Sequence, residues 1–464
     1  MVHRRKMKTA RRVVRVAAFL AGAGLAFAES ASLVASPEPG WPQFRGPRRD
    51  GVSEERGLLA TWPEGGPKLL WSAKGAGRGF SSTIIGGGRL YVTGDFDAEM
   101  RILAYDLAGQ PLWSARNGDA WLNQYQGART SVTYRDGRVY HENAHGRIVC
   151  LDAATGRELW AVDLAQRFGA ENITWGFSEC LLVDDQAVYA TAGGRDAMLV
   201  ALEARTGELR WKIPQAGPAP EQRESATYAA PILVTFAGRR LVIGCTQRQL
   251  YCADADTGVL QWTRPRVTRY SVLAVSPVLV GDAVFMTAPI GPPGQLYRLV
   301  APRAAGQPVG VEDGWTTALD TCQGGVVHRD GRLYGSTYPR RGSWQALDAR
   351  TGALLYESAE FLKGTTMWAD ERLYTLAEDG WMALLEPTEK EFAVRGRFRL
   401  AAARDRDAWA HPVIHDGRLY LRYHDTVSCY DVRALTAAAG PVRRSPRRRT
   451  HGYFAATVAT SGSP

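Results

Sequence analysis

The side chains with the clearest potential for chemistry lie just before apolar, strand-like runs at several points of this 464-residue chain. A charged group beside such a run is costly to bury without a partner, and a large aromatic ring can stack on a planar ligand. The candidate binding residues chosen on these grounds are Arg129, Trp175, Glu179, Glu224, Tyr228 and Trp409. We predict ligand binding rather than catalysis for them, because no catalytic constellation stands out around them.

Three histidines invite a metal interpretation, but their spacing argues against it. His411 and His415 are four residues apart in a predicted strand or turn, and His424 follows. In an extended chain the first two would lie about 13 Å apart, which is too far to share one ion. The chain also has no P-loop, G-x-G-x-x-G, H-E-x-x-H or serine nucleophile elbow in a suitable context, so nucleotide and hydrolase interpretations have no support.

A repeat covers most of the chain and supplies the elements that position these residues. Its clearest copy, Cys150–Trp160, has the form small-x-D-x-x-T-G-x-x-x-W. Related copies end in Trp113, Trp211, Trp262 and, with tyrosine in the last place, Tyr356. A turn and a β-rich run, typically D-G-R-L-Y, precede each copy. Each of the two signals occurs eight times, degenerate copies included, at intervals of about 40 to 53 residues.

Each interval contains four short strand candidates bounded by Gly and Asp turns. In the second interval they are residues 131–134, 138–140, 147–151 and 158–162. Short alternating runs between turn residues are typical of strands, and four of them in roughly 45 residues are typical of a propeller blade. The sequence therefore predicts an all-β fold, an eight-bladed β-propeller of four-stranded antiparallel blades.

The repeat also predicts how the blades pack and how the ring closes. Asp and Thr-Gly suit a tight turn, and the terminal tryptophan packs where blades meet. The first repeat position is small, which explains Cys150, Cys252 and Cys429 as packing residues; a pairing of Cys245 with Cys252 stays open. The eighth blade stops at Asp431, so we expect the N-terminal strand around Trp71 to complete it.

Composition and charge divide the chain into four parts. Residues 1–28 have a basic start, a short apolar run and an A-x-A site, and predict a cleaved signal peptide with no transmembrane segment in the mature chain. We expect residues 29–66 to form an N-terminal extension, 67–433 the propeller and 434–464 a basic, disordered tail. Most of the net charge of +10 lies in the two ends, so we expect no nucleic-acid partner. The signal peptide predicts a periplasmic or secreted protein.

The repeats resemble the pyrroloquinoline quinone (PQQ) repeat, whose tryptophan-docking motif is A-x-D-x-x-T-G-x-x-x-W, over about residues 68–433. The lead-in Trp41–Pro47, followed by Asp50–Ser53, is similar to the start of bacterial PQQ-binding-like propeller proteins. The resemblance implies one of two classes. Quinoprotein dehydrogenases oxidise alcohols or sugars with PQQ and Ca²⁺, whereas non-enzymatic propellers include the lipoprotein subunit of the outer-membrane β-barrel assembly machinery.

Neither class is matched in full. The enzymes usually carry a pair of neighbouring cysteines, a Glu and an Asn for calcium and an Asp base; this chain has no such cysteine pair, and the other residues cannot be placed on matched motifs. The lipobox cysteine of the assembly lipoprotein is missing near Ala28. No cofactor is therefore assigned, although PQQ with Ca²⁺ stays an alternative.

In a propeller, ligands usually sit at the axis, where the innermost strands begin, and we expect the six candidate residues to line a funnel there. The alternatives are a water-filled channel with internally paired charges, or ordinary packing between blades. We expect an exported binding or scaffold module of the cell envelope with a protein partner or small ligand at the funnel. The alternatives are a PQQ-dependent quinoprotein oxidoreductase acting on alcohols or sugars, and a polysaccharide-binding module.

Overall fold

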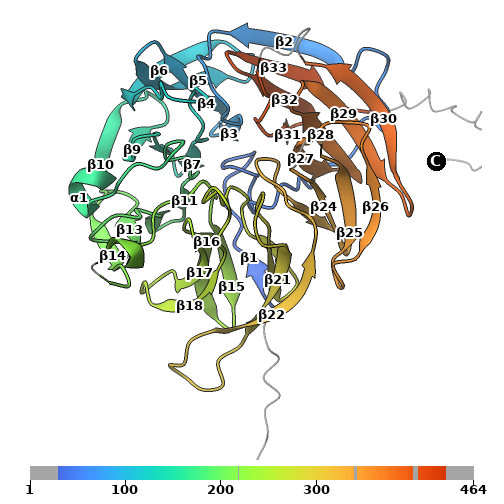
Figure 1. Ribbon diagram of the computed structural model, residues 1–464. Coiled ribbons are helices and arrows are strands. Elements are labelled where there is room, and N and C mark those ends of the chain that lie inside the picture. Colours follow the sequence, from blue (N-terminus) through green and yellow to red (C-terminus); the bar gives the residue numbers. More distant parts are fainter. Residues whose placement is uncertain (1–29, 218, 339–341, 401–405, 435–464) are drawn as a thin grey trace, which may run out of the picture.

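Eight blades surround one axis and close into a ring in the computed structural model, which describes residues 30–217, 219–338, 342–400 and 406–434 (Figure 1). Every blade is an antiparallel sheet whose first strand lies nearest the axis. The predicted eight-bladed all-β propeller is confirmed. The predicted signal peptide and all but the first residue of the predicted tail lie outside the described residues.

The first four blades follow one another along the chain from the first inner strand. Their strands are β3 (Ile84–Gly86), β4 (Arg89–Phe96), β5 (Glu99–Asp106) and β6 (Pro111–Asp119); β7 (Thr133–Arg135), β8 (Arg138–Glu142), β9 (Arg147–Asp152) and β10 (Glu158–Asp163); β11 (Leu182–Val183), β12 (Ala187–Ala190), β13 (Leu199–Glu203) and β14 (Leu209–Ile213); β15 (Ile232–Phe236), β16 (Arg239–Cys245), β17 (Gln249–Asp254) and β18 (Leu260–Pro265).

The other four blades complete the ring, and the last of them takes its outer strand from the N-terminal part of the chain. Their strands are β19 (Val278–Val280), β20 (Ala283–Met286), β21 (Gly294–Val300) and β22 (Gly310–Thr317); β23 (Val327–Arg329), β24 (Arg332–Ser336), β25 (Trp344–Asp348) and β26 (Leu354–Ser358); β27 (Gly364–Ala369), β28 (Arg372–Ala377), β29 (Trp381–Pro387) and β30 (Phe392–Arg399); β31 (Val413–His415), β32 (Arg418–Tyr423), β33 (Thr426–Asp431) and β2 (Lys68–Lys74).

Within the described part of the chain, helix is confined to two short connections. The helix α1 (Leu164–Phe168) follows the second blade, with Asp163 capping its first turn and Gly169 ending it in the left-handed conformation, and a 3₁₀ turn spans Pro220–Gln222. No helix among the described residues is long and apolar enough to cross a membrane.

The Asp and Thr-Gly positions of the repeat build the turn between the third and fourth strands. In the second blade, Asp152 Oδ1 accepts hydrogen bonds from the backbone N–H groups of Ala154 and Thr155 and from the Thr155 hydroxyl. Gly156 then adopts a φ of 73°, which L side chains rarely tolerate. The fourth and sixth blades repeat this arrangement at Asp254 and Asp348.

Tryptophans of the outer strands dock several of the blades on the next one. Trp113 Nε1 donates to the carbonyl oxygen of Ala153 in the following blade at 3.1 Å, and its ring lies against Gly156, where a Cβ atom would come within 2.6 Å of the ring. Trp160 and Trp211 make the same bond to Ala204 and Ala255. The predicted role of the tryptophans between blades is therefore what the structure shows.

The ring closes as predicted. Strand β2 pairs with β33, with Trp71 opposite Cys429, so the eighth blade receives its outer strand from the N-terminal side. Cys150, Cys252 and Cys429 at the small first position of the repeat are fully buried. All six cysteines are free thiols, so the pairing left open between Cys245 and Cys252 does not form.

The N-terminal segment 30–66 is built into the propeller, which the sequence did not predict. It crosses the end of the ring where the first and second strands turn, drawn in blue behind the blades in Figure 1. Strand β1 (Ser32–Leu33) adds a fifth strand to the fourth blade. Contacts reach all eight blades in ring order through Trp41–Ile85, Ser36–Arg135, Arg49–Leu181, Leu33–Val234, Ala31–Asp282, Arg45–Val326, Ser53–Trp368 and Glu55–Gly417.

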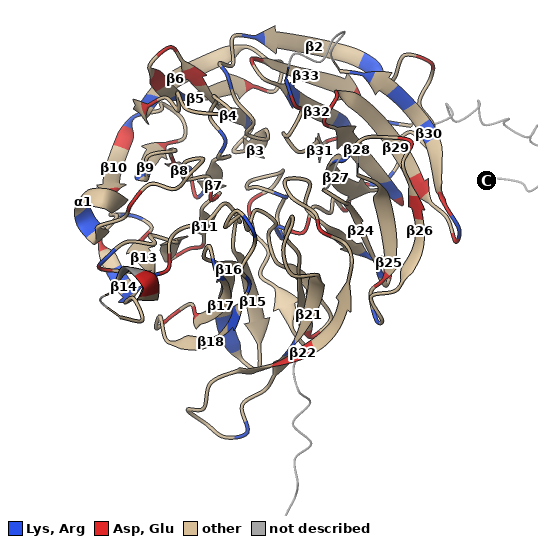
Figure 2. Ribbon diagram, in the orientation of Figure 1, with Lys and Arg blue, Asp and Glu red and all other residues tan. Residues whose placement is uncertain are grey.

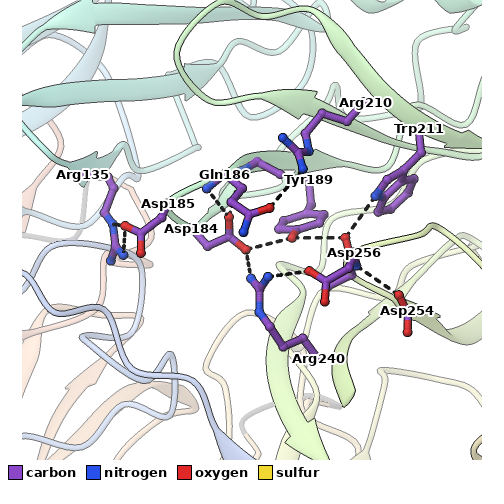
Figure 3. Close-up of polar contacts among 12 residues, drawn as sticks. Arg135, Asp184, Asp185, Gln186, Tyr189, Arg210, Trp211, Arg240, Asp254 and Asp256 are labelled. Atoms are coloured by element: carbon purple, nitrogen blue, oxygen red, sulfur yellow. Dashed lines mark hydrogen bonds and ion pairs between the residues drawn. The ribbon is translucent and has the colours of Figure 1, made fainter. Parts of the chain in front are cut away.

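Charged residues lie mainly on the outer strands and loops, with both signs interspersed around the ring (Figure 2). One group joins the third and fourth blades near the turn between β11 and β12 (Figure 3). There Asp184 pairs with Arg240 and accepts from the Tyr189 hydroxyl at 2.8 Å, and Arg240 also binds Asp256 at 2.6 Å. Because these charges satisfy one another, we assign this group to blade packing.

Candidate functional site

A cavity of about 820 Å³ opens on the axis at the end of the ring where the first strands begin. Its size is typical of small-molecule sites, which are usually concave and partly aromatic. Each blade contributes residues from the segment that leads into its first strand. In ring order these are Phe80 and Ser82, Arg129 and Ser131, Trp175 and Cys180, Tyr228, Tyr270, Cys322 and Gln323, Leu362 and Lys363, and Trp409 and His411.

Aromatic rings form two groups in the wall. Trp409 lies 4.7 Å from Phe80 and 5.5 Å from Tyr125 between ring centroids, and on another part of the wall Trp175 lies 5.8 Å from Tyr228. The rings are tilted rather than stacked face to face, and these residues keep part of their surface open to the cavity. Such a wall suits a ligand with flat apolar faces.

The cationic side chains of the wall already have partners. Arg129 donates to the carbonyl oxygens of Trp175 and Tyr125 and lies 5.3 Å from the ring centroid of Trp121. Burial lowers the pKa of Arg129 to about 10, so its guanidinium keeps its charge at neutral pH. Lys363 donates to the carbonyl oxygen of Tyr338 at 2.9 Å and lies 4.0 Å from the centroid of that ring.

A carboxylate of the same blade balances Lys363. Glu378 Oε2 lies 3.9 Å from Lys363 Nζ, and Glu378 Oε1 accepts a hydrogen bond from Trp409 Nε1 at 3.1 Å. Asp407 also lines the cavity. Among the described residues, the charged groups of the lining are two cations, Arg129 and Lys363, and two carboxylates, Glu378 and Asp407. The formal charges of these four groups cancel.

The N-terminal segment closes the floor of the cavity. Phe44 lines it and meets the ring of His411 edge to face, with centroids 4.9 Å apart. Burial lowers the pKa of His411 to about 3, so its imidazole is neutral. Nε2 of His411 lies 3.1 Å from the Gln323 carbonyl oxygen, which places this histidine in the packing of the floor.

Two buried arginines hold this floor in place from below. Arg45 donates to the carbonyl oxygens of Asp50 and Val326, and Arg49 donates to those of Cys180 and Leu181 and to Gln43. Their backbones take left-handed φ values of 63° and 59°. The segment from Gln43 to Gly51 is therefore a compact plug, anchored by charge-assisted hydrogen bonds to two blades that lie on different sides of the axis.

The cavity brings together four of the six residues that the sequence selected: Arg129, Trp175, Tyr228 and Trp409. Glu224 does not line it; this carboxylate accepts from the Thr246 hydroxyl and lies 3.2 Å from Arg248. Glu179 does not line it either and is 3% exposed. The expectation that these two glutamates face the funnel therefore differs from the structure, because each turns into the packing between strands and finds partners there.

Sequence reasoning missed several charged and aromatic groups of the wall. Phe44 was not foreseen because nothing in its motif indicates that the segment enters the axis. Lys363 precedes a first strand and could have been found by the rule that selected Arg129. Tyr338 and Glu378 follow the second strands β24 and β28, which return to the same end of the ring. Loops after second strands are thus a second source of lining residues.

Glu179 forms a buried carboxyl pair with Glu142 at the end of β8. The two side chains are 3% and 2% exposed, and one oxygen of each, Oε2 of Glu179 and Oε1 of Glu142, has no hydrogen-bond partner among the described residues. Burial raises the pKa of Glu179 to about 7, and burial together with the neighbouring Glu179 charge raises that of Glu142 well above its usual value. Thr191 and the charge of Arg49 act on Glu179 in the opposite sense.

Because of this carboxyl pair, we expect the free energy of unfolding of the chain to depend on pH. A raised pKa means that the folded chain holds a proton that the unfolded chain has released, so stability falls as pH rises from about 4.5 toward 7. The slope is about 1.4 kcal/mol per pH unit for each such group. Glu179→Gln removes one titration, so the variant should be more stable than the parent at pH 8 and no more stable at pH 4.5, in urea unfolding followed by tryptophan fluorescence.

The matched control is Glu158→Gln, which changes a solvent-exposed carboxylate paired with Arg147 at 3.0 Å. Its effect should be under about 1 kcal/mol at both pH values. A difference between Glu179→Gln and the parent that is equal at pH 4.5 and pH 8 would contradict the buried pair as the source.

The lining does not fit a calcium ion. Calcium takes about six to eight oxygen ligands. The cavity offers the carboxylates of Glu378 and Asp407, and Glu378 already binds Lys363 and Trp409. Among the residues that the structure describes, no group of three or more His, Cys, Asp or Glu is arranged to hold a metal ion. Cys180 and Cys322 line the cavity as separate free thiols from the third and sixth blades.

Fold and repeat together define the class: a closed eight-bladed propeller of PQQ-type repeats with its cavity on the axis. A family model described as outer membrane protein assembly factor BamB matches residues 98–356, more than half of the chain, and the chain belongs to this family.

Relatives come from both branches of the propeller class. The chain is 28% identical over 221 residues to outer membrane protein assembly factor BamB of Burkholderia pseudomallei, covering 46% of this chain and 52% of the relative. It is 28% identical over 164 residues to quinohemoprotein alcohol dehydrogenase ADH IIB of Pseudomonas putida, covering 31% of this chain and 21% of the relative. The chain thus spans about a fifth to a half of the curated relatives it matches.

Solved structures support the fold. Quinohemoprotein alcohol dehydrogenase from Comamonas testosteroni matches with a TM-score of 0.59 at 14% identity, over 91% of this chain and 83% of that one. BamB from Moraxella catarrhalis matches with a TM-score of 0.54 at 15% identity, over 78% of this chain and 97% of that one. At these identities the likeness concerns the fold alone.

Proposed function

We propose that this chain is an exported propeller of the cell envelope that acts as a binding or scaffold module and takes a small ligand in its axial cavity. The observation that carries the proposal is the cavity of about 820 Å³, walled by aromatic residues from several blades and closed by Phe44. A blind, partly aromatic cavity of this size buries most of a small ligand. Family membership supports the envelope location, because the matching family is described as an outer membrane assembly factor.

The second candidate function is a PQQ-dependent oxidoreductase acting on alcohols or sugars. It is favoured by the quinoprotein dehydrogenases among the relatives and by their shared propeller fold. Against it stand the charges of the lining. Pyrroloquinoline quinone carries several carboxylates, whereas the two cations that the structure describes in the wall, Arg129 and Lys363, are already engaged by carbonyl oxygens or Glu378. The donor set also fits no calcium ion, so the binding function is the better supported of the two.

Reconstitution separates the two functions. The full chain is incubated with PQQ and Ca²⁺, bound PQQ is measured by equilibrium dialysis, and dye reduction is followed over a panel of alcohols and sugars. A quinohemoprotein alcohol dehydrogenase treated in the same way is the positive control. We expect neither stoichiometric PQQ binding nor dye reduction by this chain. Stoichiometric binding accompanied by dye reduction would overturn the proposal in favour of the oxidoreductase.

A further inference from the structure

The ligand class follows from three properties of the wall, and the inference rests on the proposed binding function. The first property is charge. The Arg129 guanidinium donates hydrogen bonds to two backbone carbonyl oxygens and lies over the Trp121 ring. The Lys363 ammonium group donates to the Tyr338 carbonyl oxygen and pairs with Glu378. An anionic ligand would have to displace these bonds before it gained its own, so the cations give it little net affinity.

The second property is the distribution of apolar surface. Trp409 and Trp175 stand in two separate aromatic groups of the wall, and Phe44 lies at the floor. Rings in such positions offer stacking surfaces to a ligand whose own ring faces are apolar. A fully extended aliphatic ligand would use the rings equally well but would leave the polar part of the wall without partners.

The third property is the polar groups between the rings. Ser82, Ser131 and Ser178 line the cavity, as do Glu378 and Asp407. Ser178 is the more open of the three serines, because the buried Ser82 and Ser131 hydroxyls each accept a backbone N–H, and Glu378 keeps its bonds to Lys363 and Trp409. Hydroxyl groups both donate and accept hydrogen bonds, and carboxylates accept them. This set therefore suits a ligand that carries hydroxyl groups around its ring. Carboxylates that accept hydrogen bonds from hydroxyl groups also repel an acidic ligand.

We infer that the cavity binds an uncharged sugar ring, as a residue of a neutral glycan, without oxidising it. The aromatic groups stack on the faces of the ring, and the serine hydroxyls and the carboxylates bind its hydroxyl groups. The N-terminal plug makes the cavity blind, so a glycan enters from the open end of the ring and its terminal residue reaches Phe44.

The test compares neutral with acidic sugars on the full chain. A glycan array finds neutral binders, and isothermal titration calorimetry then compares the best neutral oligosaccharide with its uronic-acid counterpart. We expect the neutral sugar to bind at least tenfold more tightly than the acidic one. Trp409→Ala should weaken neutral-sugar binding by about tenfold or more, since stacking and the bond to Glu378 are both lost.

The matched control is Trp381→Ala, which removes a tryptophan that packs beneath Arg397 and Arg399, outside the cavity lining. This variant should bind the neutral sugar like the parent. Two results would overturn the inference: no neutral glycan binds at all, or the acidic sugar binds more tightly than the neutral one. Neither touches the proposed binding function, which fails only if PQQ binds with dye reduction.

Discussion

Arg49→Ala should lower the apparent unfolding free energy by about 3 kcal/mol. Arg49 is 3% exposed and donates to the carbonyl oxygens of Cys180 and Leu181 and to Gln43. Truncation leaves the Cys180 carbonyl and the Gln43 side-chain oxygen without this donor, while the Leu181 carbonyl keeps the Thr133 hydroxyl. Each unsatisfied buried group costs about 1–3 kcal/mol. The plug should also loosen, so we expect Cys180, which lines the cavity beside it, to react faster with a maleimide. Urea unfolding and mass-spectrometric mapping of the label check both effects.

The neighbouring Arg48 provides a matched control. Its side chain is 32% exposed and forms ion pairs with Asp50 and Glu54 at 2.8 Å and 2.7 Å. Exposed pairs contribute under about 1 kcal/mol, so Arg48→Ala should change stability little and leave the Cys180 reaction rate unchanged. Equal effects of the two substitutions would mean that the plug is not anchored by the buried guanidinium.

Trp113→Ala should also cost about 3 kcal/mol or more. The substitution removes the docking of the first blade on the second, including the bond to the Ala153 carbonyl oxygen. Large-to-small changes of buried aromatic residues cost about 3–5 kcal/mol, and a half-buried ring falls at the lower end. Leu112→Ala alters the preceding residue, which is 47% exposed, and should cost less than about 1 kcal/mol. Thermal and urea unfolding measure both.

The glycine that receives this ring gives an independent measurement of the same interface. Gly156→Ala places a methyl group 2.6 Å from Trp113, whereas Gly137→Ala, at a similar φ of 69°, meets nothing within 4 Å. Both changes strain a left-handed backbone by about 1–2 kcal/mol, and only the first adds overpacking of about 1–3 kcal/mol. If the two variants were equally stable, the tryptophan would not be docked on Gly156.

The fold was predictable because the same pattern of turn and docking residues recurs eight times along the chain, degenerate copies included. Asp152, Thr155 and Gly156 shape one turn locally, and Trp113 from the blade before packs on it at a fixed place in the sequence period. Ring closure was predictable for the same reason. The eighth blade lacks an outer strand in its own part of the chain, and the N-terminal strand β2 has no other blade to join. Such features depend on local chemistry and on period, and both can be read without coordinates.

The candidate site was predictable only in part. The rule that residues before first strands face the axis placed Arg129, Trp175, Tyr228 and Trp409 at the cavity. The same rule gave no information on side-chain direction. Glu179, one residue before Cys180, lies in a buried pair with Glu142, while Cys180 itself lines the cavity. Which of two neighbouring residues faces the axis depends on local packing.

By itself the sequence determined the repeat, the number of blades, the closing strand and the packing role of Cys150, Cys252 and Cys429. Only the tertiary structure decided that Phe44 forms the floor of the cavity, that Arg45 and Arg49 anchor it, and that Lys363 and Glu378 neutralise each other in its wall. The physical reason is the sequence separation between the residues that are in contact. Turns and blade docking repeat over neighbouring segments, whereas Arg45 meets Val326 across 281 residues, and no periodic pattern encodes such a contact.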